Sequence, residues 1–391
     1  MKKKFGITIV IIALGLLGLH QNYPLDYVMR VLIKQESNTD DYKWQQVEEI
    51  KAPFVSKKIN RKLNEDWVRT IFERDPEISN ALETFLEQKN TTSFIVIRDS
   101  SIIYEQYFNG HSIETPTPVF SISKSIISLL LGQSIERGEI GGLDTAITDY
   151  IPELEESDPG FSNISFANLV DMQSGIAYDS DVSFPFINSD DALIYYSNDL
   201  QSILLNKLSL ESSPGIFEYN DYNPNIIALA LTRATGETIT QLVQERIWKP
   251  LGVEFDGSWV TDWKGFPRAE SGLVMRPVDL AKVGLAMIHI RDSSSVISKV
   301  WHHRSMNRLN EDNFEEYNGK QWGYSTGWWI VSRPEKPHDI AAIGAHGQYL
   351  YISPKNNIII VRTGKDGSDW GDGDFISLYY RAAALLNENP E

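Results

Sequence analysis

A serine and a lysine one helical turn apart are the residues of this sequence that are best placed to do chemistry. They are Ser121 and Lys124, in the segment FSISKS at 120–125. Residues three apart share one face of a helix, so a helix that begins at Ser121 holds the hydroxyl beside the amine. A desolvated lysine amine at the positive end of a helix can take the serine proton. The pair predicts a serine nucleophile activated by Lys124, although a capping serine followed by a surface lysine is the alternative for this segment alone.

Two further segments could complete such a site. The first, PGIFEYNDYN at 214–223, places Tyr219 and Tyr222 in a loop before a helix. A tyrosine there can carry a proton, although packing in the loop is the alternative role. The second, GAHGQYLYI at 344–352, opens a strand with small residues. Its backbone N–H groups could hold an oxyanion, while His346 taken alone would fit a strand edge.

In this order, the three segments resemble the serine β-lactamase and penicillin-binding-protein superfamily. They are most similar to its class C β-lactamase-like branch, which includes carboxylesterases, D-aminopeptidases and 6-aminohexanoate-dimer hydrolases. The segments LVDMQSGI at 169–176 and 271–281 agree with this resemblance. It covers residues 80 to 388 approximately.

The resemblance implies an α/β (α+β) fold like that of β-lactamases and DD-peptidases. An antiparallel sheet flanked by helices carries an inserted, mainly helical subdomain, and the active site lies between the two. Ser121 is expected to attack a carbonyl. Lys124 and Tyr219 are expected to act together, first as general base and then as acid to the leaving group. Water then hydrolyses the acyl-enzyme.

The resemblance also assigns the groups that hold the substrate. The oxyanion is expected between the N–H groups of Ser121 and Gln348, and Asp221, His346 and Gly347 are expected to bind substrate. Two departures bear on the substrate. The segment 345–347 stands where true β-lactamases carry Lys-Thr-Gly, which argues against penicillin recognition. Asp221 stands where the family often has Asn, and its carboxylate disfavours anionic substrates. The segment 362–364 (RTG) mimics Lys-Thr-Gly but ends the next strand.

We therefore expect a hydrolase of carboxylesterase or amidase type that cleaves an ester or a linear amide of a small molecule or peptide. The alternative is an acylable sensor or a peptidoglycan-binding module with little turnover, which the rate of deacylation would distinguish.

A second interpretation uses GYSTG at 323–327, with Ser325 in a nucleophile elbow. The elbow needs a strand before it and a helix after it, whereas a polar loop precedes and a strand follows.

Composition argues against several other kinds of function. The 391 residues carry a formal net charge of -17, which disfavours nucleic-acid binding. The chain has no cysteine, which excludes disulfides, thiolate zinc sites and a cysteine nucleophile. No His-Glu-x-x-His occurs, so we expect neither a metal nor a cofactor. The oligomeric state stays open.

The first residues indicate export. Three lysines at 2–4 precede a run at 5–19 whose only polar residue is Thr8. Such a segment is a signal peptide or a short N-terminal anchor, and both stay open. The body is then periplasmic or otherwise outside the cytoplasm, touching the membrane only through this segment.

The remaining chain divides by pattern into a lead-in at 23–75 and a hydrolase body at 76–388. Runs at 92–98 and 102–108 predict a hairpin, and 121–137 predicts an amphipathic helix. Helical patterns dominate to residue 300, and strands at 327–332, 348–352 and 357–362 precede a helix at 374–387. The sheet parts are therefore 76–120 and 301–388, with the helical part at 121–300 between them.

Overall fold

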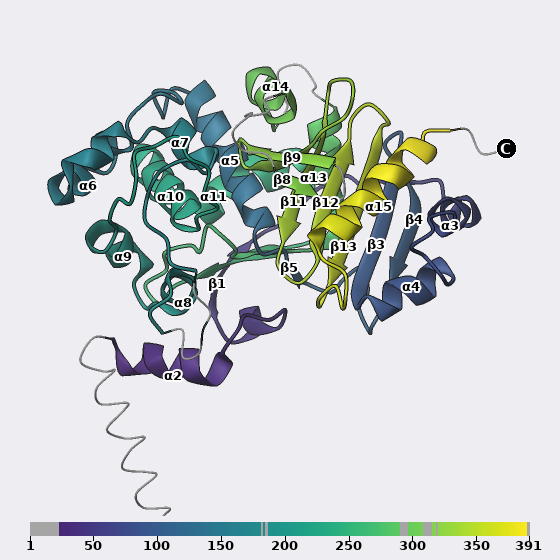
Figure 1. Cartoon of the computed structure of the whole chain (residues 1–391), viewed down its shortest axis with the longest axis horizontal. Helices are drawn as coiled ribbons and strands as arrows, with labels where there is room; N and C mark the ends of the chain where they lie inside the picture. Colours follow the sequence, from purple (N-terminus) through teal and green to yellow (C-terminus); the bar gives the residue numbers. More distant parts are fainter. Residues whose placement is uncertain are drawn as a thin grey trace, which may run out of the picture.

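The computed structural model describes residues 23–180, 183, 187–289, 296–307, 315–317 and 320–388. The predicted signal or anchor segment at 1–22 lies outside them. A mainly helical part stands beside a large sheet, on the left and right of Figure 1 respectively. Within the described residues, no helix is both long enough and apolar enough to cross a membrane.

The large sheet has nine strands and joins the two ends of the hydrolase body. The early hairpin meets the late strands where Val96 pairs with Ile360, so the chain leaves the sheet and returns to it, as predicted. Neighbouring strands of this sheet are antiparallel, except for the first two strands in the order given next, which are parallel. In spatial order the strands are β2 (Asn60–Arg61), β4 (Ser101–Tyr107), β3 (Thr91–Arg98), β13 (Ile358–Gly364), β12 (Gln348–Ser353), β11 (Asp339–Gly344), β10 (Trp328–Val331), β9 (Lys320–Ser325) and β8 (Glu315–Tyr317).

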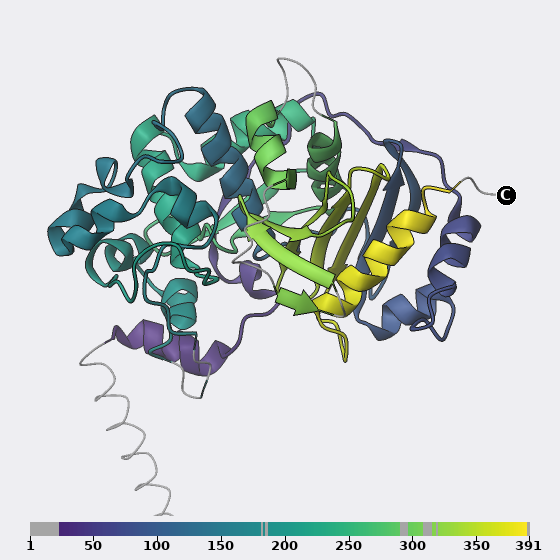
Figure 2. The ribbon, with the colours of Figure 1, turned by 45° about the horizontal axis from the view of Figure 1, so that its top comes forward.

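Both faces of this sheet are buried. Alternate side chains of a strand point to opposite faces, so neighbouring residues of one strand belong to different hydrophobic clusters. On β3, Phe94 and Val96 belong to one hydrophobic cluster and Ile95 and Ile97 to the other. The first cluster lies under α15 (Asp372–Leu385), α3 (Glu65–Glu73) and α4 (Leu82–Gln88), and Figure 2 shows α15 crossing the sheet. The second lies under α5 (Ile122–Glu136) and α13 (Pro277–Ile288).

The helical part includes a second sheet that the sequence did not predict. It has the order β1 (Gln46–Ile50), β6 (Gly257–Thr261), β7 (Leu273–Met275) and β5 (Thr117–Pro118). Such short strands leave little alternation to detect. The helices of this part are α2 (Leu25–Lys34), α6 (Pro152–Ser157), α7 (Phe166–Val170), α8 (Asp190–Tyr196), α9 (Leu200–Asn206), α10 (Tyr222–Thr235), α11 (Ile239–Val243) and α12 (Lys249–Leu251), while α14 (Lys299–Asn307) lies at the top of Figure 1.

Helix α5, which begins at the predicted nucleophile, is buried from Ile122 to Ser134 rather than amphipathic. The sequence predicted an amphipathic helix, but the hydroxyls of Ser123, Ser125 and Ser128 bond to backbone groups inside the protein. Ser123 Oγ accepts from Leu273 N at 3.0 Å, and Ser125 Oγ donates to Gly327 O at 2.7 Å. Buried hydroxyls are tolerated when they are bonded in this way. Helix α5 is therefore a central helix between the two parts.

Close packing around α5 gives a stability prediction. A Cβ added at Gly132 would lie 2.5 Å from the Trp301 ring. Gly132→Ala should therefore lower the free energy of unfolding by about 1–3 kcal/mol, although alanine is the better helix former. Urea unfolding followed by circular dichroism measures this. Gly132→Ala combined with Trp301→Leu should cost less than the sum of the two single variants, and simple additivity would contradict the clash.

Candidate active site

The backbone holds Ser121 in a strained bend at the start of α5. Phe120 has a φ of 48°, in the left-handed region, which non-glycine residues adopt mainly where function requires it. Val119 N donates to Leu273 O at 2.9 Å and fixes the approach to the bend. Gly344 of β11 lies so close that an added Cβ would be 2.2 Å from Val119 O. The bend leaves Ser121 partly exposed at the end of a buried helix.

The amine of Lys124 is almost completely buried and has three oxygen partners. Lys124 Nζ lies 2.7 Å from Ser121 Oγ, 2.9 Å from the carbonyl oxygen of Glu270 and 3.0 Å from Asp221 Oδ1. An ammonium group has three N–H donors, so these contacts use all of them. The predicted pair is therefore in contact, and Asp221 supplies the opposing charge.

One asparagine ties together the two segments that surround Lys124. Asn225 Nδ2 donates to Asp221 O at 2.7 Å and to Glu270 Oε2 at 2.9 Å. Its Oδ1 accepts from Ala269 N at 3.0 Å. Burial raises the pKa of the Glu270 carboxyl, and the nearby negative charge of Asp221 raises it further. The N-terminal turn of α10 is thus locked to the segment before β7.

Tyr219 reaches the nucleophile from the loop before α10. Its ring stacks on Trp329 at 5.7 Å and 17°, and Lys124 Nζ lies 5.0 Å from the ring centroid. The loop is held because Asn220 Nδ2 donates to Ile176 O at 2.8 Å. Burial and the charge of Asp221 raise the pKa of Tyr219 well above its usual range, while a hydrogen bond with Ser121 acts in the opposite direction. Tyr219 is therefore protonated at rest.

Two cavities meet at Ser121 and Ala345, which line both. The first, of about 350 Å³, extends toward α8 and the N-terminal segment. Its other lining residues are Gln35, Glu36, Ser37, Phe120, Ser189, Asp191, Ala192, Ile194, Tyr195, Tyr196, Asp221, Glu270, Ser271 and His346. The second, of about 360 Å³, is walled by aromatic residues. It is lined also by Tyr219, Trp322, Trp329, Ile343, Gly344, Gly371, Asp372 and Gly373.

The first cavity is acidic. Four of its described lining residues are carboxylates, Glu36, Asp191, Asp221 and Glu270, and none is Lys or Arg. Asp191 accepts a hydrogen bond from the Tyr178 hydroxyl, and burial raises the pKa of this carboxyl. Since Asp221 is paired with Lys124, the carboxyl groups of Glu36, Asp191 and Glu270 remain as the groups of this cavity that could receive a cation.

The three residues predicted at the start of the late strand, His346, Gly347 and Gln348, have different surroundings. His346 lines the first cavity and packs against Phe120, with ring centroids 4.9 Å apart, and burial lowers its pKa. Gly347 and Gln348 line neither cavity. Gly347 O accepts from Arg362, and Gln348 Nε2 donates to the carbonyl oxygens of His346 and Gly364.

Ala345, rather than Gln348, is the residue of this strand that lies beside Ser121 in both cavities. Within the described part of the chain, the backbone N–H groups of Ser121 and Ala345 donate to no other protein group. His346 and Gly347, which connect Ala345 to Gln348, both have positive φ, 63° and 75°.

Ser325 does not form a nucleophile elbow. It is fully buried at the end of β9, and its Oγ donates to Asp171 Oδ1 at 3.0 Å. The residues that follow turn into β10 rather than into a helix. The segment before Ser325 is strand, not the expected loop.

Sequence reasoning missed several residues that line the cavities, among them Glu36, Asp191 and Glu270. Glu270 directly precedes the segment 271–281 that supported the resemblance, so a weak signal existed. Nothing in the sequence indicated Glu36 or Asp191, because these residues reach the site only through tertiary packing.

Comparison with known proteins matches residues 78–369 to the β-lactamase family model. A 6-aminohexanoate-dimer hydrolase of Paenarthrobacter ureafaciens is 26% identical over 308 residues, covering 75% of this chain and 76% of the relative. A solved structure named "Putative 6-aminohexanoate-dimer hydrolase from Bacillus anthracis" has a TM-score of 0.77 at 21% identity, covering 95% of this chain and 97% of that one. A class C β-lactamase in complex with cefoxitin has a TM-score of 0.60 at 13% identity, covering 83% of this chain and 100% of that one.

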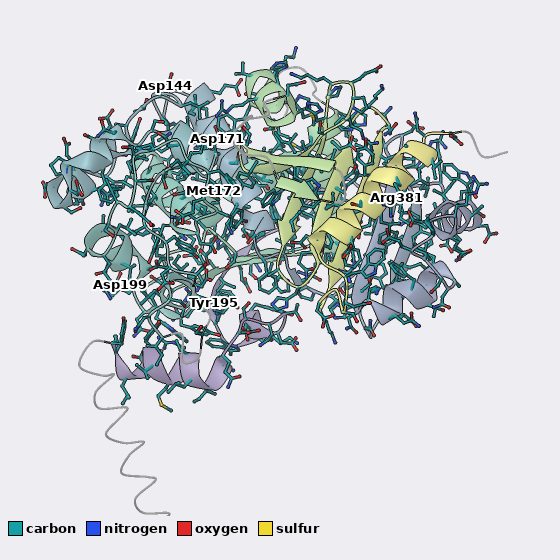
Figure 3. The ribbon with its side chains drawn as sticks, viewed as in Figure 1. Asp144, Asp171, Met172, Tyr195, Asp199 and Arg381 are labelled. Atoms are coloured by element: carbon teal, nitrogen blue, oxygen red, sulfur yellow. The ribbon has the colours of Figure 1, made fainter. Side chains whose placement is uncertain are left out.

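The contact between Asp221 and the catalytic groups gives a pH prediction. The charge of Asp221 raises the pKa of Tyr219, so Asp221→Asn should lower that pKa. The alkaline limb of the kcat/KM profile should therefore lie at lower pH in Asp221→Asn than in the wild type. Asp144→Asn removes an exposed carboxylate at the edge of the helical part (Figure 3) and should leave the profile unchanged. An unmoved limb in Asp221→Asn would contradict the electrostatic role.

Proposed function

The chain belongs to the β-lactamase family and is a serine hydrolase, and from this premise we propose that it cleaves an ester or a linear amide through an acyl-enzyme on Ser121. The observation that carries the proposal is the contact of Lys124 Nζ with Ser121 Oγ at 2.7 Å, at the mouth of two cavities. Nucleophile and base in hydrogen-bond contact are the signature of covalent catalysis.

In the acylation step, Ser121 Oγ attacks the substrate carbonyl carbon. Lys124 first releases one ammonium proton to solvent, and its neutral amine then takes the serine proton while Tyr219 keeps its own and the carbonyl oxygen becomes an oxyanion. We assign the oxyanion to the N–H groups of Ser121 and Ala345, in place of the Gln348 donor expected from the sequence. Two preorganised backbone donors at that point stabilise the developing charge.

Release of the leaving group reverses the proton transfer. The pair returns a proton to the leaving nitrogen or oxygen as its bond to the carbonyl carbon breaks. The raised pKa of Tyr219 suits this role, because it keeps the phenol protonated until a base needs the proton. Water then attacks the acyl-enzyme, the pair takes its proton, and Ser121 regains its hydroxyl.

The acidic cavity defines the charge of the substrate. Asp191 and Glu270 line the same cavity as Ser121, and no lysine or arginine is among the described lining residues. Such a cavity favours a substrate that carries an ammonium group and disfavours an anionic one. We therefore propose esters or linear amides with an amino group as substrates, and not penicillins.

Ser121→Ala should abolish turnover of a short-chain p-nitrophenyl ester, reducing kcat/KM by about 10³-fold or more. Ser325→Ala is the matched control and should keep the wild-type rate, provided that the variant is folded by circular dichroism. Steady turnover by the wild type supports a hydrolase, and a stoichiometric burst without turnover would support the sensor. Equal rates in Ser121→Ala and wild type would refute the nucleophile assignment.

A further inference from the structure

The N-terminal segment builds one wall of the acidic cavity. Gln35, Glu36 and Ser37, which follow α2, line the same cavity as Ser121. They lie outside residues 78–369, the part of the chain that matches the family model. The substrate cavity is thus completed by a segment added in front of the family domain.

Several contacts fix this segment on the end of α8. The Tyr196 hydroxyl donates to Gln35 O at 2.6 Å, and Arg30 Nη2 donates to Tyr196 O at 2.9 Å. Trp44 stacks on Tyr196 with centroids 6.3 Å apart and planes at 10°. Tyr195, which lies above the purple N-terminal segment in Figure 3, also lines the cavity. The wall is therefore built by specific bonds and is not a loose chain end.

The same segment contacts the turn that carries the oxyanion donor. Ser37 Oγ lies 3.3 Å from His346 Nε2, and His346 directly follows Ala345. The residue that turns the chain out of α2 is Gln35, with a φ of 57°. The segment 35–37 thus connects α8 to the β11–β12 turn along one side of the cavity.

Glu36 has a different environment from the other carboxylates of the cavity. Asp191 is half-buried and bonded to Tyr178, and Asp221 is paired with Lys124. Glu36 is exposed, and within the described residues it has no ion-pair partner. A carboxylate at the rim is available to a cation that extends outward from Ser121.

We propose that Glu36 is a specificity-determining residue that binds the distal ammonium group of longer substrates. This inference rests on the proposed function. A shorter substrate places its ammonium group near Asp191, whereas a longer one carries it to the rim. Because Glu36 does not touch the reacting atoms, it should affect KM and leave kcat unchanged.

The test uses the full chain and p-nitrophenyl esters of hexanoic, octanoic and decanoic acids with a terminal amino or a terminal hydroxy group. Glu36→Gln should lower kcat/KM for the longer amino esters by about two- to fivefold, the size expected for an exposed ion pair. The loss should appear in KM and shrink at high salt. Rates on the hydroxy esters should not change.

Asp40→Asn is the matched control, since Asp40 carries the same charge close by, bonds to Lys43 and does not line this cavity. An equal loss in Asp40→Asn, or no loss at any chain length in Glu36→Gln, would overturn the role of Glu36. Failure of the proposed function is seen separately, as hydroxy-ester turnover that survives Ser121→Ala, and it would overturn the inference as well.

Discussion

The burial of one cation beside the nucleophile is the constraint on which the rest of this structure depends. Lys124 Nζ is held by Ser121 Oγ, Asp221 and the Glu270 carbonyl within 3.0 Å. A buried charge that lacks such partners costs several kcal/mol. The start of α5, the N-terminus of α10 and the segment before β7 must therefore stay in register, and Asn225 bonds two of them together.

The large sheet and the helical part each supply a different side of the site. The sheet is buried on both faces and provides the C-terminal end of β11, where Gly344 lets the backbone approach Val119 closely. The helical part provides the acidic side of the site and the loop that carries Tyr219. Ser121 lies between them and opens to an acidic and an aromatic cavity. The acyl and the leaving-group portions of a substrate can therefore occupy surroundings of different chemistry.

Spacing along the chain predicted what is local. Ser121 and Lys124 lie one turn apart on a helix, and the hairpin of β3 and β4 follows from β-branched runs. What depends on tertiary structure could not be predicted. Packing between distant segments buries α5 on all sides, places Ala345 rather than Gln348 beside Ser121 in both cavities, and brings Glu36 to the first cavity through the contact of α2 with α8.

Direct detection of the acyl-enzyme tests the central claim most closely. The chain would be mixed with a p-nitrophenyl ester, quenched in acid within the first turnovers, and analysed by intact mass and peptide mapping. We expect one added acyl group per chain, located on Ser121 and absent from Ser121→Ala. Turnover without any acylated species, or an acyl group on another residue such as Ser325, would contradict it.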